Sequence, residues 1–255
     1  FSDTLPSGLT VATGSSAQCG GTLTTTNPSA ISFAGGTLAA SASCGITATI
    51  TATTAGPHDN VSGFVSSTQS GTNTGATGIA SASLTAVSSP SISKQFAPNP
   101  ILAGGVSKLT FTISNPNQNN ALSGVAFSDT FPVAPGNMVV APTPNPTTSG
   151  CGSPTFSPVA GAGSISFTGG TVAAGGNCYV TVDVTAPNAG AYNNTSGNVS
   201  HVINAATVNG NTASGSLTVK AANPGISFLK QVGLGGASDP WKSFLAIATG
   251  GNVYY

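Results

Sequence analysis

The sequence predicts an all-β protein, and three observations support this class. Short runs rich in Val, Ile, Thr and Phe alternate apolar with polar residues, which is the period of half-buried strands. Gly, Pro and Asn separate these runs at short intervals, as the turns between strands require. No stretch of useful length shows the periodicity of a helix. This pattern suits tandem immunoglobulin-like β-sandwiches better than a barrel.

The expected strands follow one another most clearly in the second half of the chain. Several of them carry the alternation, and each is bounded by turn residues. They are expected at 91–96, 107–115, 124–130, 137–141, 164–172, 178–186, 193–203 and 213–219.

The chain also contains an internal repeat. "FSDTLP", which begins at Phe1, returns as "FSDTFP" at Phe127. The match continues downstream, since residues 29–56 resemble residues 163–190 and "HDNVSG" resembles "YNNTSG". The repeat predicts a series of modules.

The first copy lacks the opening strands of the second copy. "SISKQF" at 91–96 opens the complete copy and returns as "SFLKQV" at 227–232. A module without its first strands exposes sheet edges and apolar core unless a neighbour supplies them. Either a longer polypeptide supplies them, or subunits donate strands to one another head to tail. A strand matching 112–126 occurs at neither end, which favours the longer polypeptide. We expect a repeat lacking its first strands, a complete repeat and the first strands of a further repeat, at 1–90, 91–223 and 224–255.

The composition excludes several kinds of partner. Charged residues make up 4% of the 255 residues, against about 25% in an average soluble protein. The formal net charge is zero, so we expect no nucleic-acid partner. No apolar run approaches the roughly 20 residues of a membrane helix, so we expect no membrane span in this segment. The chain begins with Phe, which indicates a processed or partial product.

Four features together are similar to the DUF11-type repeats of large bacterial surface proteins. They are the strand "FTISNP", the turn "DTLP", a Cys ahead of an alternating strand, and the element "GAYNN". The resemblance implies immunoglobulin-like modules in tandem, at the cell surface or in the extracellular space, without catalytic activity. We therefore expect a structural repeat protein that forms a stalk, fibre or filament from copies of itself stacked head to tail. The alternative is an adhesin whose exposed loops bind glycan, the cell surface or a host protein.

Four cysteines occur as one pair in each repeat, at equivalent places. An even count in a chain of secreted-type composition predicts the disulfides Cys19–Cys44 and Cys151–Cys178. Two buried free thiols in each module are the alternative. A zinc site is not expected, because it needs closely spaced ligand pairs.

Charged residues are so scarce that the position of each one is informative. Surface proteins of this architecture sometimes join Lys to Asn through an isopeptide bond, with the help of a buried acid. Burial favours this chemistry because it neutralises the amine and protonates the carboxyl. Lys94, Asp129 and Asn194 have the required types on three expected strands; alternatively, Asp129 bonds its own turn and Lys94 points to water. The equivalents in the other copies are Asp3, Asn60 and Lys230.

The other polar candidates carry no recognisable chemistry. His58 and His201 lack a paired nucleophile and acid, and we expect both at the surface or at a sheet edge. Asp59 and Asp183 are too isolated for a calcium site, which needs several clustered oxygens. Trp241 is expected to pack in a core. We expect no enzymatic activity, no cofactor and no metal.

Overall fold

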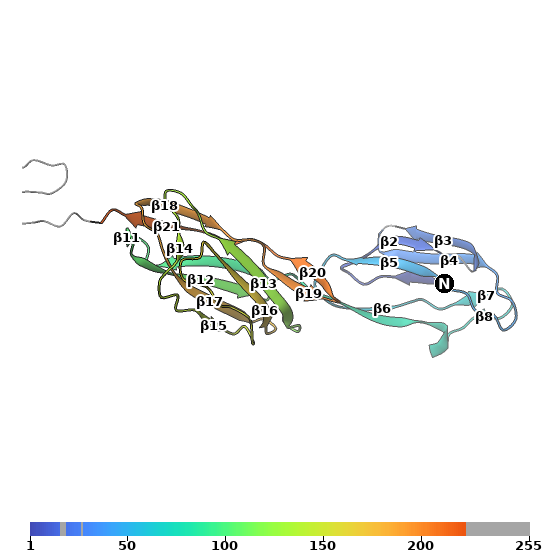
Figure 1. The fold of residues 1–255 in the computed structure, drawn as a ribbon. Coiled ribbons are helices and arrows are strands. Elements are labelled where there is room, and N and C mark those ends of the chain that lie inside the picture. Colours follow the sequence, from blue (N-terminus) through green and yellow to red (C-terminus); the bar gives the residue numbers. More distant parts are fainter. Residues whose placement is uncertain (16–18, 27, 223–255) are drawn as a thin grey trace, which may run out of the picture.

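The computed structural model describes residues 1–15, 19–26 and 28–222, which form two β modules arranged end to end (Figure 1). We call residues 1–86 the first module, 91–220 the second module and 87–90 the linker. In these described residues regular structure is almost entirely strand, with one short 3₁₀ helix at Ala76–Gly78, so the all-β prediction is confirmed. No helix in the described part of the chain has the length and apolar character to cross a membrane.

The second module is a sandwich of hydrogen-bonded sheets. One sheet has the order β10-β12-β17-β14, with β15 also paired to β17, and a second has the order β16-β13-β19-β20. The strand β21 pairs with β18 on one side and, in parallel, with β11 on the other. The bounds are β10 Ser91–Ala97, β11 Ile101–Leu102, β12 Val106–Ser114, β13 Leu122–Thr130, β14 Val139–Val140, β15 Thr147–Ser149, β16 Ser164–Val172, β17 Asn177–Thr185, β18 Gly190–Thr195, β19 Ser200–Ile203, β20 Ala206–Asn209 and β21 Ser214–Lys220.

One apolar core holds the sheets of the second module together. Alternate residues of β12 and β17 point inward and are fully buried. Across the sandwich, the ring of Phe111 on β12 lies 4.7 Å from that of Phe127 on β13, and Phe127 stacks on Phe167 of β16. Burial of such rings provides most of the driving force for packing the two faces.

The first module contains smaller sheets, of two or three strands each. Its pairings are β1-β4-β3, β2-β5, β6-β9 and β7-β8. The bounds are β1 Ser2–Thr4, β2 Leu9–Ser15, β3 Gly20–Thr26, β4 Ala30–Gly36, β5 Thr47–Ala52, β6 Gly56–Val61, β7 Ser66–Ser67, β8 Gly71–Thr72 and β9 Ser81–Ala86.

The two modules share the register of their common strands. Asp3 on β1 lies opposite Ile31 on β4. Asp129 on β13 lies opposite Ile165 on β16, the same pairing one repeat later. The sequence repeat is therefore also a structural repeat, in which β1, β4, β5, β6 and β9 correspond to β13, β16, β17, β18 and β21. Within the described residues, the first module has no strand at the places of β10 and β12.

One expected strand was wrong in extent. The segment 193–203 forms two strands, β18 and β19, which pair with β21 and with β13 respectively. The chain changes sheets between them, because Ser196 Oγ accepts from Ala213 N at 2.9 Å and Gly197 N donates to Ser128 O at 2.9 Å. These bonds satisfy the backbone groups that follow the end of the pairing with β21.

Candidate functional site

The candidate site lies in the core of the second module, and β10 brings a lysine into it. Ile92, Lys94 and Phe96 alternate along β10, so all three side chains point to the same, inward face. The side chain of Asn211 holds the strand in place, accepting from Ile92 N at 2.8 Å and donating to Ile92 O at 2.9 Å. Lys94 thus occupies a position at which the pattern of the strand calls for an apolar residue.

The other two members of the site are also polar residues in apolar rows. On β13, Asp129 continues the buried row that contains Val125 and Phe127. On β18, Asn194 follows the buried Tyr192 on the same face. All three polar side chains therefore converge on one place between the sheets.

Direct contacts join the three side chains. Lys94 Nζ lies 3.0 Å from Asp129 Oδ2, and it also contacts Asn194 Oδ1. Asn194 Nδ2 donates to Asp129 Oδ1 at 2.9 Å and to Thr130 O at 3.0 Å. Because a backbone carbonyl can only accept, the bond to Thr130 identifies the amide nitrogen of Asn194. The carboxyl therefore contacts the nitrogen of the carboxamide and the amine of the lysine.

Burial shifts both ionisable groups toward their neutral forms. The side chains of Lys94 and Asp129 are 0% exposed. Burial lowers the pKa of Lys94 and raises the pKa of Asp129, and their mutual attraction offsets each shift only in part. The ring of Phe111, whose centroid lies 5.5 Å from Lys94 Nζ, forms part of the apolar wall. A neutral amine, a protonated acid and a carboxamide in contact are the groups needed for transamidation.

The first module contains two of the three equivalent residues. Asn60 Nδ2 on β6 donates to Asp3 Oδ2 on β1 at 2.8 Å. The remaining oxygens, Asp3 Oδ1 and Asn60 Oδ1, are buried and have no hydrogen-bond partner. Lys230 lies outside the described residues.

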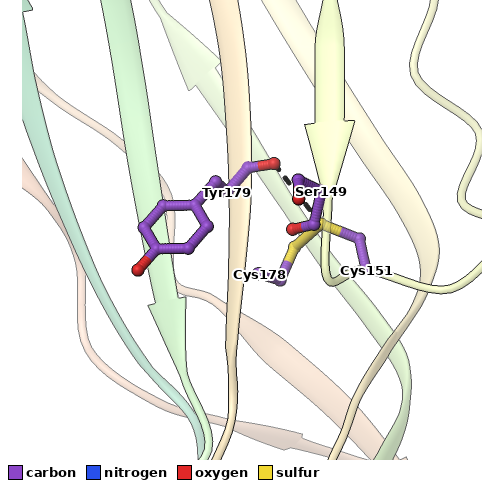
Figure 2. Close-up of a disulfide and its surroundings, with 4 residues drawn as sticks. All are labelled: Ser149, Cys151, Cys178 and Tyr179. Carbon is purple, nitrogen blue, oxygen red and sulfur yellow. Dashed lines mark hydrogen bonds between the residues drawn. A yellow bond between two sulfur atoms is a disulfide. The ribbon is translucent and has the colours of Figure 1, made fainter.

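The four cysteines form the two expected disulfides. Cys19 is bonded to Cys44, with their Cα atoms 5.2 Å apart, and Cys151 is bonded to Cys178, with their Cα atoms 4.7 Å apart. Figure 2 shows the second bond, which ties the loop after β15 to β17 beside Ser149 and Tyr179. Closing a loop of this length stabilises a fold by about 3–4 kcal/mol in the chain-entropy description.

Both histidines are buried, so the expected surface position was wrong, although His58 lies on β6, an edge strand of its two-stranded sheet. His58 is 6% exposed, and its Nε2 lies 3.0 Å from Thr54 O. The equivalent residue in the second module is Tyr192, whose hydroxyl likewise donates to the carbonyl of the residue four positions earlier, Asn188, at 3.0 Å. His58 therefore takes the place of a core tyrosine and repeats its bond.

The second histidine is buried through the alternation of its strand. His201 on β19 is 2% exposed, and its Nε2 has no hydrogen-bond partner. Burial lowers the pKa of His201 below its usual value.

The remaining candidates do not form a site. Asp183 is buried and accepts from Asn145 Nδ2 at 2.8 Å, whereas Asp59 is exposed on β6. Among the described residues, no cluster of three or more His, Cys, Asp or Glu residues could hold a metal ion. Trp241 lies outside the described residues.

The chain belongs to a protein family defined by sequence. Residues 1–86 and 90–219 match the family described as "Domain of unknown function (DUF7933)". The matched family is DUF7933, and the likeness to DUF11-type repeats stays a resemblance. No curated protein matches the chain in sequence.

Several solved structures are similar to the chain at a low level. The C-terminal domain of the AgI/II polypeptide BspA of Streptococcus agalactiae has 12% identity and a TM-score of 0.44, over 86% of this chain and 83% of that chain. A cohesin module from a family 33 glycoside hydrolase of Clostridium perfringens has 7% identity and a TM-score of 0.42, over 53% of this chain and 100% of that chain. BcpA, the major pilin subunit of Bacillus cereus, has 11% identity and a TM-score of 0.38, over 51% of this chain and 39% of that chain. No function is transferred from these distant likenesses.

Proposed function

We propose that the chain is a structural segment of an extracellular rod or fibre of a bacterial cell, built from modules stacked in series. The observation that carries this proposal is the buried contact between Lys94, Asp129 and Asn194. In the proposed protein, an amide bond between Lys94 Nζ and Asn194 Cγ closes the second module. Two disulfides and a nearly uncharged polar surface support a place outside the cell.

A restrained linker supports the rod. Asn117 of the second module accepts from Ser88 N at 2.8 Å and donates to Ser88 O at 2.9 Å, which fixes the linker at its centre. Pro90 is buried against Gly210, where an added Cβ would lie 2.0 Å from Pro90 O. Any side chain at position 210 would therefore displace the linker. Both contacts attach the linker to the second module, so the linker leaves that module in a fixed direction.

The proposed bond forms without an external reactant. The neutral amine of Lys94 attacks Asn194 Cγ, and the new C–N bond replaces the bond from Cγ to Nδ2. Asp129 takes the amine proton at Oδ2 and delivers a proton from Oδ1 to Nδ2, since it contacts both nitrogens. Ammonia leaves, and the acid is regenerated. In this geometry the acid assists the leaving nitrogen, because Asp129 Oδ1 contacts Asn194 Nδ2.

Intact-mass measurement of the purified chain tests the bond. We expect a mass lower by one ammonia than the mass of the chain with two disulfides, and a branched peptide joining Lys94 to Asn194 after proteolysis. Asp129→Asn keeps the size of the side chain but removes the acid, so this variant should retain the ammonia. Lys108→Met, which alters an exposed lysine of β12, is the matched control and should still lose it. An unmodified mass of the folded wild-type chain contradicts the proposed bond.

Electron microscopy of the negatively stained chain tests the rod. We expect straight particles that keep the same angle between modules. Monomers with freely varying angles that bind to a glycan array favour the adhesin.

A further inference from the structure

The last strand of the second module has a gap in its row of inward-facing side chains. Along β21, Leu217 and Val219 are buried and point inward, and the inward position that precedes them on this strand is Gly215. Gly215 lies directly opposite Asn194 in the pairing of β21 with β18. The strand therefore places no side chain beside the carboxamide of the candidate site.

The side chain of Lys94 fills this gap. The strand β10 lies beside β21, and β21 pairs with β18, so the path from Lys94 to Asn194 runs across β21. A Cβ added at position 215 would lie 3.4 Å from Lys94 Cγ and 3.5 Å from Lys94 O. It would also lie 3.4 Å from Cε2 of Phe96, which belongs to the same strand. Atoms at these separations are already in contact, so any side chain larger than a methyl group would meet Lys94 or Phe96.

Two asparagine side chains hold β10 at this distance from β21. No backbone pairing joins β10 to β21 among the described strands. Asn99, just after β10, accepts from Thr218 N at 2.9 Å and donates to Ser216 O at 2.8 Å, and both groups belong to β21. Asn211, just ahead of β21, binds the backbone N and O of Ile92 near the start of β10. The strand is thus attached near both of its ends, so it cannot move outward to make room for a larger neighbour.

The equivalent position of the first module also has a small residue. The stretch "ASASLTAV" at 80–87 resembles "ASGSLTVK" at 213–220, so Ala82 corresponds to Gly215. Ala82 on β9 lies directly opposite Asn60 on β6, the equivalent of Asn194. In both copies, therefore, the residue opposite the asparagine is no larger than alanine.

We propose that Gly215 is a positioning residue for the amide bond of the second module, because its missing side chain leaves the passage through which the amine of Lys94 reaches Asn194. The proposal rests on the transamidation proposed above. A larger residue at position 215 leaves the carboxamide in place, since Asp129 and Thr130 hold the Asn194 side chain. It displaces the lysine, and a displacement of about 1 Å lowers the rate of such a reaction by about 100-fold. The residue opposite the asparagine then determines whether the module closes its bond.

The rate at which the refolding full-length chain releases ammonia from Asn194 tests this role. Gly215→Val should release it about 100-fold more slowly than the wild-type chain. Gly215→Ala should lie between the two, because its Cβ only reaches contact distance. Ser214→Val adds the same side chain at the neighbouring, exposed position of β21, so this matched control should react at the wild-type rate. Release at the wild-type rate by Gly215→Val overturns the proposal.

A comparison of two backgrounds separates a displaced lysine from a general failure to fold. Lys94→Met keeps the passage filled and Lys94→Ala empties it, and neither background can form the bond. Gly215→Val should lower the urea midpoint of unfolding in the Met background and lower it less in the Ala background. Equal losses in the two backgrounds, or failure of both to fold, show that valine acts elsewhere and overturn the proposal.

The outcomes also separate this proposal from the function proposed above. A wild-type chain that releases ammonia, with Gly215→Val equally fast, overturns only the role of Gly215 and leaves the bond between Lys94 and Asn194 intact. A wild-type chain that releases none contradicts the bond and, with it, the positioning role.

Discussion

A cross-link between Lys94 and Asn194 would control how far the second module can be stretched. Tension enters the module at β10 and leaves at β21, because these are its first and last strands. With the bond in place, the load passes from Lys94 directly to Asn194, and the chain between them carries none. Lys94→Met removes the bond and is expected to make this segment extensible.

The gain in length follows from the spacing of the residues. Lys94 and Asn194 are 100 residues apart, and a fully extended chain spans about 3.4 Å per residue, or about 340 Å. The disulfide Cys151–Cys178 encloses a separation of 27 residues and withholds about 90 Å of this length. Lys94→Met should therefore lengthen the unfolded second module by about 250 Å when oxidised and about 340 Å when reduced.

Single-molecule force spectroscopy measures this difference directly. The chain is held between reference domains of known length, and the contour length released on unfolding is compared with that of Lys94→Met. Lys108→Met serves as the control, since it removes a lysine of the neighbouring strand outside the core. Equal contour lengths for the wild-type chain and Lys94→Met refute the reasoning.

Three further predictions concern the pH response and stability of the second module. Burial lowers the pKa of Lys94 and raises the pKa of Asp129, so the range of pH in which the pair holds one proton is narrower than for an exposed pair. The rate of ammonia release during refolding, measured by mass spectrometry of quenched samples, should be highest in that range and fall in acid and in alkali. A rate that keeps rising with pH contradicts this. Replacing Cys151 and Cys178 with Ala should lower the free energy of unfolding by about 3–4 kcal/mol in urea titrations, and an unchanged midpoint speaks against it. Burial lowers the pKa of His201 below its usual 6.5. As the pH falls below 6.5, the unfolded chain therefore binds a proton at this histidine before the folded chain does. The free energy of unfolding then decreases by at most about 1.4 kcal/mol per pH unit. His201→Leu should reduce this acid sensitivity in thermal melts at a series of pH values, and an undiminished slope argues against the assignment.

Sequence reasoning recovered the strands that face the core on one side. Residues 164–172 were expected as a strand and form β16 with the same bounds, because alternation and turn residues agree there. The strands β11, β15 and β20 were missed. Each has only two to four residues, which is too short for a recognisable alternation of apolar and polar residues. Their positions follow from tertiary pairing.

The lysine of the candidate site could also be predicted from the alternation of apolar and polar residues. In a chain with so few charges, Lys94 between Ile92 and Phe96 interrupts an apolar row, and this alone places an amine in the core. The same reasoning applied to His58 would have found its burial, since the repeat aligns it with Tyr192. The carboxyl's contact with the amide nitrogen could not be foreseen, because it depends on the carbonyl of Thr130 orienting the Asn194 side chain.

The disulfide of the second module also affects how the chain responds to proteolysis. Residues 152–163 form a largely exposed stretch in which Val159 is 69% accessible, and such stretches are where proteases cut. This stretch lies inside the ring closed by Cys151 and Cys178. Cleavage of one peptide bond there opens the ring, but the two parts of the chain stay connected through the disulfide. A cut in this loop would therefore leave the residues on both sides of it connected.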